Sequence, residues 1–235
     1  MVSDNGSVVI VGGTSEIGKR IGQRYADQGY NVILTSRDVA EAKAAAKELG
    51  ERATGIALNL SKPHEIGEAL AEVGPVKYLV LVAIERDANT VDAFNVDGAL
   101  NLVTLKLVGY IEVIHALRDR LSDDSAIVLF GGLAKERPYP GSITVTTVNG
   151  GVATMIKSLA IQLAPIRVNA LHPAIVGDSP FWAATPPEVL EAFRARTPLG
   201  RLIEIDDVVH ATAFLLENGA VNAENLHLDG GWLAT

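Results

Sequence analysis

Short β-branched, apolar runs alternate with segments of helical periodicity along the whole chain, and this alternation limits the possible folds more than any other feature. The expected strands are residues 7–11, 31–35, 53–58, 78–83, 126–130, 167–171 and 225–228. Helices are expected from residue 17 and over residues 39–49, 64–72, 90–121 with a break near Gly109, 144–163, 186–196 and 206–217. The sequence therefore predicts a doubly wound α/β fold: a mainly parallel sheet of about seven strands with helices on both faces.

The composition fits one such domain spanning residues 1–235, because a hydrophobic content of 48% supplies a sizeable core. A net charge of −8 without a basic block argues against a nucleic-acid partner. Without cysteine the chain has neither disulfides nor thiolate metal sites, and residues 1–7 lack the pattern of a signal peptide. Apolar runs such as residues 78–84 are far shorter than the roughly 20 residues that span a bilayer. We expect a soluble, cytoplasmic protein that acts on a small molecule.

A glycine-rich turn, residues 12–18 (GGTSEIG), joins the first expected strand to the first helix. Glycines let the backbone approach a diphosphate, whose charge is favoured at the positive N-terminus of the following helix. Glu16 argues against such a site unless its carboxylate points to solvent. The alternative is a turn with a purely structural role.

Ser36 and Arg37 follow the second expected strand, where an acidic residue would bind the ribose 2′-hydroxyl of NAD. An arginine there can instead pair with a 2′-phosphate, which favours NADP(H) over NAD(H). The alternative is a solvated arginine at the start of a helix.

Several segments together resemble the short-chain dehydrogenase/reductase family along nearly the whole chain. They are the G-x-x-x-G-x-G turn of residues 12–18, Asn59-Leu60, Asn95, residues 166–170 (IRVNA), 198–201 (PLGR) and 229–232 (DGGW). The resemblance implies a Rossmann-type fold, a nicotinamide cofactor and a homodimer or homotetramer. The cofactor-binding residues it implies are Gly12, Thr14, Ser15, Ile17, Gly18, Ser36, Arg37, Asn59, Leu60, Ala83, Asn149, Pro173, Ile175 and Val176.

The residues that carry the family's chemistry are mostly missing. The family pairs a tyrosine acid/base with a lysine four residues later on one helix, so that the ammonium favours the phenolate. An alignment on residues 157–160 puts Val145 and Asn149 at these positions, and Gly132 at that of the serine. No tyrosine of the chain is followed four residues later by lysine. Of the usual four catalytic residues, only Asn95 matches.

A substitute proton donor is expected in the loops after the fifth and sixth strands, where open α/β sheets bind ligands. His172 has an ordinary pKa near neutrality, and Tyr139 stands in a loop able to cover the pocket. Structural roles are the alternative for both, and Lys135 and Asp178 are most simply exposed charges. Residues 176–196 are the expected substrate loop, and the chain shows no metal-site or hydrolase motif.

Three functions remain open at this stage. The first is an atypical NADP(H)-dependent oxidoreductase with a non-standard proton donor. The second is an NADP(H)-binding sensor or partner subunit without redox turnover. The third is a lyase or isomerase that uses the same pocket with His172 or Tyr139 as proton carrier.

Overall fold

The computed structural model describes residues 6–235. Its strands are β1 (Ser7–Val11), β2 (Asn31–Ser36), β3 (Ala53–Ala57), β4 (Val76–Leu81), β5 (Leu121–Phe130), β6 (Arg167–Pro173) and β7 (Asn225–Leu228). Its helices are α1 (Glu16–Asp27), α2 (Val39–Leu49), α3 (Pro63–Ala69), α4 (Val96–Val103), α5 (Tyr110–Leu117), α6 (Ile143–Gln162), α7 (Pro180–Ala183), α8 (Pro187–Arg196) and α9 (Ile205–Glu217). Short 3-10 turns are η2 (Arg118–Arg120), η3 (Leu133–Lys135) and η4 (Trp232–Ala234), and η1 (Thr104–Gly109) is a π-helical segment between α4 and α5.

The seven strands form one parallel sheet in the order β3-β2-β1-β4-β5-β6-β7. The order reverses direction between β1 and β4, the position at which doubly wound sheets bind ligands. Register brings the strand ends together at one edge, because Val11 pairs with both Thr35 and Leu81, and Leu81 pairs with Leu129. The predicted doubly wound parallel sheet of about seven strands is confirmed.

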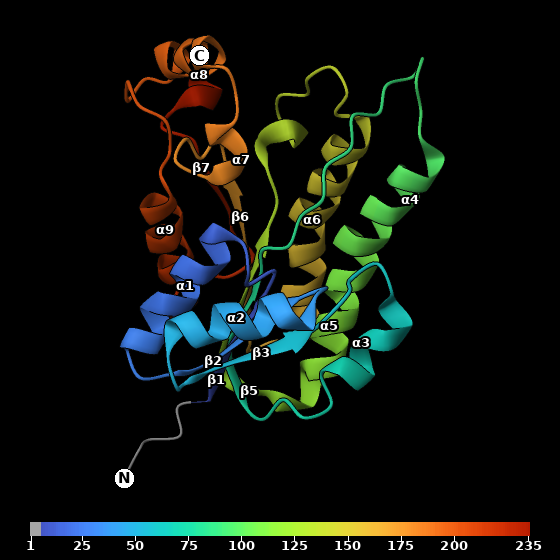
Figure 1. Cartoon of the computed structure of the whole chain (residues 1–235), viewed down its shortest axis with the longest axis vertical. Helices are drawn as coiled ribbons and strands as arrows, with labels where there is room; N and C mark the ends of the chain where they lie inside the picture. Colours follow the sequence, from blue (N-terminus) through green and yellow to red (C-terminus); the bar gives the residue numbers. More distant parts are fainter. Residues whose placement is uncertain (1–5) are drawn as a thin grey trace.

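Helices cover both faces of the sheet (Figure 1). One layer contains α1, α2 and α9, and the other contains α3, α4, α5 and α6. Each face has its own apolar core, one built around Ile21, Leu34 and Val208 and the other around Leu79 and Val113. Central strand residues are buried on both sides, as continuous apolar runs predict.

Several element boundaries differ from the sequence prediction, most of all around the long helix and strands β4 and β5. The long helix begins at Val96 instead of residue 90, because the buried Asn89 side chain fixes the preceding backbone by bonding the N–H and C=O of Asn95. Strand β4 begins two residues earlier than predicted, since Val76 pairs with Leu121, and so residue 121 belongs to β5. The break expected near Gly109 is the π-helical segment η1, which ends at that residue. Helix α7 was not predicted.

The helical run Val96–Arg120 is, by length and composition alone, long and apolar enough to cross a membrane. Its packing accounts for this composition, because Tyr110, Val113 and Leu117 are fully buried in the core beneath the sheet. Buried core helices of α/β domains can have the same length and composition.

Candidate active site

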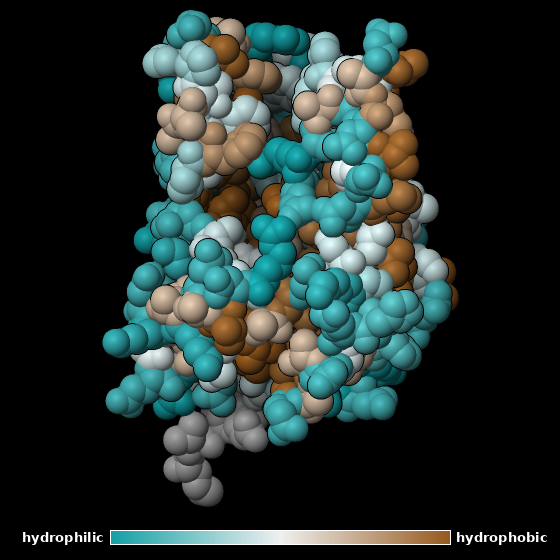
Figure 2. Space-filling model, turned by 45° about the vertical axis from the view of Figure 1, so that its right-hand side comes forward, coloured by the Kyte–Doolittle hydropathy of each residue, from teal (hydrophilic) through white to brown (hydrophobic). Residues whose placement is uncertain are grey.

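A cavity of about 790 Å³ opens at the carboxyl edge of the sheet. It is bounded by the glycine turn at Ile17, the ends of β4, β5 and β6, helices α6, α7 and α8, and the C-terminal turn. Figure 2 shows this end of the molecule hollowed between two lobes, with hydrophobic side chains in the recess. The volume of this cavity, its position at the carboxyl edge and its lining of both apolar and polar residues are typical of a small-molecule site.

The glycine turn is shaped by close backbone contacts. Gly12 has φ of +87°, and a Cβ on it would lie 2.7 Å from the Ala83 backbone. A Cβ on Gly18 would lie 2.5 Å from the carbonyl oxygen of Gly12. Ser15 caps α1, because its hydroxyl accepts from Gly18 N–H and donates to Gly12 C=O. The remaining N–H groups of the first turn of α1 have no partner within the helix, as a diphosphate site requires.

Glu16 does not obstruct this site. Its carboxylate lies 3.7 Å from the ammonium of Lys19, one turn along α1, and that ammonium also bonds Glu48. The negative charge of Glu16 therefore lies on the surface of α1 beside the ammonium of Lys19.

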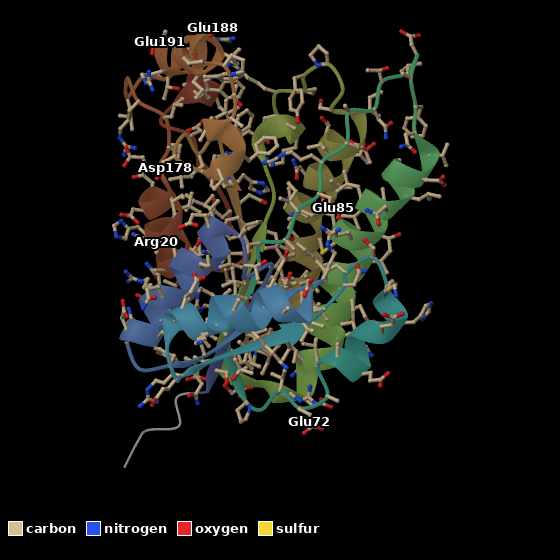
Figure 3. The ribbon with its side chains drawn as sticks, viewed as in Figure 1. Arg20, Glu72, Glu85, Asp178, Glu188 and Glu191 are labelled. Carbon is tan, nitrogen blue, oxygen red and sulfur yellow. The ribbon has the colours of Figure 1, made fainter. Side chains whose placement is uncertain are left out.

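Where the sequence predicts the ribose site, Arg37 forms an ion pair with Glu85. Glu85, labelled in Figure 3, lies on the segment between β4 and α4. The Arg37 side chain is 67% exposed, so it is free to exchange this carboxylate for a phosphate. Ser36 donates to Glu41, and Asn59 caps its own turn by accepting from Ser61 N–H. Ser36 ends β2, Arg37 follows it and Asn59 follows β3, at the same edge of the sheet as the glycine turn.

Of the other predicted cofactor residues, Ile17, Asn149, Pro173, Ile175 and Val176 line the cavity itself. Within residues 6–235, five buried side-chain polar atoms lack a hydrogen-bond partner, and three belong to cavity residues: Arg137, Asn149 and Trp232. Such orphaned groups are costly unless a ligand satisfies them. The residues present therefore fit a polar ligand such as a nicotinamide nucleotide.

Gly132, Val145 and Asn149, which the sequence alignment predicts at the positions of the family's serine, tyrosine and lysine, all line the cavity. A Cβ on Gly132 would lie 2.8 Å from the amide nitrogen of Asn149, so a serine there requires Asn149 to move. The three positions thus lie on one wall, and none of them holds a group that transfers protons near neutral pH.

The structure does not bring Asn95 into the cavity. It lies at the N-cap of α4, exposed, and its side chain accepts from Gly98 N–H at 3.0 Å. Tyr139 is at the mouth of the cavity and is 51% exposed. Asp178 caps α9 by accepting from Ile205 N–H (Figure 3), and Lys135 pairs with Glu136.

His172 is fully buried behind the cavity wall instead of lining it. Its Nδ1 accepts from Gly132 N–H at 3.2 Å, so Nε2 carries the hydrogen that it donates to Asn225 Oδ1 at 2.8 Å. Burial lowers its pKa from 6.5 to about 4. Both nitrogens are thus engaged in a neutral ring that supports the backbone at Gly132, and nothing in this geometry favours His172 as a general acid.

The neutral state of His172 predicts acid sensitivity. As pH falls from 6.5 to 4, the unfolded chain binds a proton at this residue before the folded chain does, so the free energy of unfolding falls by about 3 kcal/mol at most. Urea unfolding of H172Q at pH 6.5 and 4.5 should show a smaller loss than that of the wild type. The control H64Q, on an exposed histidine, should keep the wild-type loss. Equal losses in H172Q and the wild type would contradict the neutral assignment.

Sequence reasoning missed Lys106, which is 0% exposed and forms part of the cavity wall. Its Nζ donates to the hydroxyl of Tyr110 at 2.7 Å and to the carbonyl oxygen of Ala83 at 3.2 Å. The Tyr110 hydroxyl in turn lies 2.8 Å from Leu81 C=O and 2.7 Å from Ala83 C=O. The signal of Lys106 in the sequence is a lysine four residues before a tyrosine in an apolar helix, the reverse of the order that the family uses.

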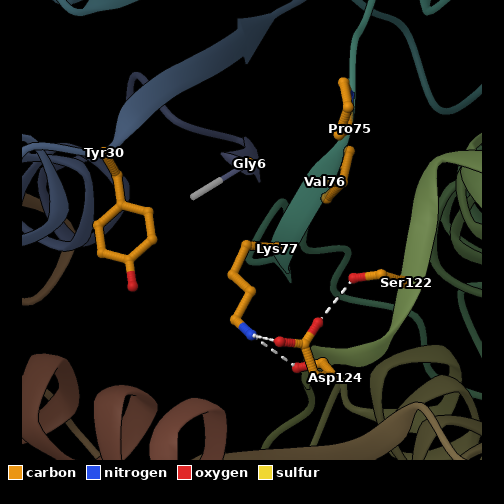
Figure 4. Close-up of a pocket in the computed structure, with 7 residues that line it drawn as sticks. All are labelled: Gly6, Tyr30, Pro75, Val76, Lys77, Ser122 and Asp124. Atoms are coloured by element: carbon orange, nitrogen blue, oxygen red, sulfur yellow. Dashed lines mark hydrogen bonds and ion pairs between the residues drawn. The ribbon is translucent and has the colours of Figure 1, made fainter. Parts of the chain in front are cut away.

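A smaller hollow of about 380 Å³ lies at the opposite, amino edge of the sheet (Figure 4). The ammonium of Lys77 and the carboxylate of Asp124 pair at 2.5 Å across it, and Ser122 also bonds Asp124. Lys77, Ser122 and Asp124 thus satisfy one another, and the hollow lies away from the carboxyl ends of the strands, which position ligands. Within residues 6–235, no group of three or more potential metal ligands is present either.

A glycine turn before α1, an arginine after β2 and a cavity at the reversal of strand order define a dinucleotide-binding α/β protein. A family model described as Enoyl-(Acyl carrier protein) reductase matches residues 12–233. The chain therefore belongs to the short-chain dehydrogenase/reductase family of oxidoreductases, which implies a nicotinamide cofactor.

Individual relatives agree with this placement. The 3-oxoacyl-[acyl-carrier-protein] reductase of Rattus norvegicus is 31% identical over 229 residues, which cover 94% of this chain and 95% of that protein. Carbonyl reductase family member 4 of Xenopus tropicalis is 31% identical over 231 residues, with 94% and 95% coverage. A crystal structure of a short-chain dehydrogenase/reductase from Brucella melitensis matches with a TM-score of 0.90 at 25% identity, over 97% of this chain and 96% of that one.

Proposed function

We propose that the protein is an NADP(H)-dependent oxidoreductase that reduces the carbonyl group of a small organic substrate, using a proton donor other than the family's tyrosine. The observation that carries the proposal is the cavity that runs from the glycine turn to α8 and contains the orphaned Asn149 amide oxygen. Several relatives are named as reductases of 3-oxoacyl or carbonyl compounds, which supports a carbonyl substrate.

In this proposal different residues of the chain bind different parts of the cofactor. The first turn of α1, capped by Ser15, binds the diphosphate, and Arg37 binds the 2′-phosphate. Asn149 bonds the nicotinamide ribose, and Ile175 and Val176 pack beside the ring. The bound nicotinamide supplies a hydride, while the residues of this chain hold the substrate and exclude water.

The substrate side of the cavity is assigned to residues 176–196. Within this range Trp182 of α7 and Phe193 of α8 line the cavity. The guanidinium of Arg86 lies 4.0 Å from the centre of the Phe181 ring, which connects α7 to the segment after β4. We propose that α7 and α8 cover the substrate and determine which carbonyl compound enters.

Stopped-flow absorbance of NADPH tests the proposal with 3-oxoacyl thioesters, ketones and enones as substrates. Oxidation of NADPH by one of these classes is the expected result. Binding of NADPH without oxidation by any of them would favour the second candidate, a nucleotide-binding protein without turnover. The observation on which that candidate rests is the loss of proton-transferring side chains at Gly132, Val145 and Asn149. Conversion of substrate without added nucleotide would favour a lyase or isomerase.

Arg37 predicts the preference for NADP(H). R37L should weaken NADPH binding about tenfold or more, because a charge-assisted hydrogen bond to the phosphate is worth roughly 1.5–3 kcal/mol. NADH, which lacks this phosphate, should bind nearly as before. Isothermal titration of both nucleotides measures the ratio, with R52L at the other edge of the sheet as control. Equal weakening for the two nucleotides would contradict the assignment.

We also propose that the protein is a homodimer or homotetramer. An apolar row on the outer face of α4, η1 and α5 is exposed to solvent: Val96, Leu100, Val108 and Ile111. Figure 2 shows hydrophobic surface along this side of the molecule. Light scattering should give a multiple of the 24.8 kDa chain mass and a monomer for L100E/I111E, whereas V39E on α2 should leave the mass unchanged. A wild-type monomer would contradict the proposal.

A further inference from the structure

The ammonium of Lys106 is buried, and no carboxylate pairs with it to offset the free-energy cost of removing its charge from water. Its hydrogen-bond partners, the Tyr110 hydroxyl and the Ala83 carbonyl oxygen, are both neutral. Within residues 6–235 none of the ion pairs closer than 4.0 Å includes Lys106. Buried charges are ordinarily paired, so an unpaired lysine in the wall of a cavity is a sign of function.

The backbone at Lys106 is also unusual. Lys106 lies within η1, a π-helical segment inserted between two α-helices, and such segments occur frequently at functional sites. Tyr110 follows directly after the segment and is itself fully buried. Lysine and tyrosine, four residues apart, are thus brought together beneath the end of β4.

The position of Lys106 matches the positions of the missing groups. Gly132, Val145 and Asn149 line the same cavity, and η1 packs against α6, which carries two of them. An ammonium has three N–H donors, and Tyr110 and Ala83 take two of them. No acceptor within residues 6–235 takes the third, which remains for a substrate atom at this wall of the cavity.

Resting on the proposed function, we propose that Lys106 is the proton donor of this enzyme and that Tyr110 is the residue that positions it. The substrate oxygen, gaining electrons as the carbonyl carbon receives its hydride, takes a proton from Lys106 Nζ. The N–H bond breaks, an O–H bond forms, and Nζ keeps the electron pair as a neutral amine. After product release, solvent in the open cavity returns a proton to Nζ, and the hydroxide left behind passes to bulk water.

The electrostatic surroundings suit this role. Burial, and secondarily the positive charge of Arg86, lower the pKa of Lys106 to about 7. The other titratable groups near it are Tyr110 on α5, whose pKa is raised well above 10 by burial, and His172 on β6, which is neutral. Asn149, on α6, is uncharged. An acid that titrates near neutrality is suited to give a proton and to regain it.

The test compares wild type, K106M, K106R and Y110F, with K157M on the exposed side of α6 as a lysine control. NADPH binding by fluorescence should be unchanged in all of them. Single-turnover reduction should fall at least 100-fold in K106M and in K106R, because arginine keeps the charge but does not release the proton. In the wild type the rate of reduction should decline as pH rises through about 7. In Y110F this decline should occur at lower pH, because the substitution removes a hydrogen-bond acceptor of the ammonium.

A second readout does not depend on turnover. The ¹³Cε resonance of Lys106, assigned by its loss in K106M, should titrate near pH 7 in the wild type. Titration above pH 9, or K106M or K106R retaining the wild-type rate, would overturn the assignment of Lys106 while the proposed reductase function stands. Failure of the wild type to oxidise NADPH with any substrate would overturn both.

Discussion

K106M is expected to unfold less readily than the wild type at pH 6 while losing the proposed activity. The fall in the pKa of Lys106 from 10.5 to about 7 corresponds to a cost of about 5 kcal/mol at most when the ammonium is buried. Methionine has a similar length and no charge, and Tyr110 keeps its carbonyl partners after the substitution. With allowance for the lost hydrogen bonds and imperfect packing, a gain of about 2 kcal/mol is expected.

The pH dependence of this gain follows from the sign of the shift. Below about pH 7 both the folded and the unfolded chain bind the proton, and the folded state bears the full cost of the buried charge. Between pH 7 and 10.5 only the unfolded chain binds it, so the wild type becomes progressively more stable relative to K106M. Urea unfolding at pH 6 and 9.5 measures both effects, and K157M should show neither. A K106M protein less stable than the wild type at pH 6 would mean that the ammonium stabilises the fold.

The sheet could be predicted from sequence because parallel strands buried on both faces are continuous apolar runs, such as residues 78–81 and 126–130. Element ends were predicted less well where tertiary hydrogen bonds decide them. The start of α4 depends on the side chain of Asn89, which also bonds Thr144 at the start of α6, 55 residues away. Periodicity within the segment carries no sign of that contact.

The same difference between local and tertiary features applies to the candidate active site. The glycine turn and Arg37 are local features, and the fold places them together at the strand ends. Lys106 becomes a candidate only when the fold removes it from water, because the pattern of an isolated helix does not reveal burial against β4 and α6. His172 shows the reverse case: its ordinary pKa suggests an acid, but burial and two hydrogen bonds keep it neutral.

G12A should impair cofactor binding far more than a matched glycine substitution elsewhere. Gly12 and Gly29 have nearly the same φ, +87° and +86°, so alanine suffers similar backbone strain at both positions, about 1 kcal/mol. They differ in their surroundings: a Cβ on Gly12 would lie 2.7 Å from Ala83 backbone atoms, whereas a Cβ on Gly29 meets nothing within 4 Å. The comparison therefore separates the contact from the strain.

In G12A the turn and the end of β4 have to move apart, which displaces the first turn of α1 and the carbonyl oxygen of Ala83. We expect a loss of about 3 kcal/mol in the free energy of unfolding, against about 1 kcal/mol in G29A. NADPH affinity should fall at least 30-fold in G12A and less than twofold in G29A, because only the first variant moves the N–H groups proposed to hold the diphosphate. Urea unfolding and fluorescence titration measure the two quantities. If G12A bound NADPH as tightly as G29A does, the diphosphate would have to lie elsewhere, and the assignment of the glycine turn would fail even though the fold stands.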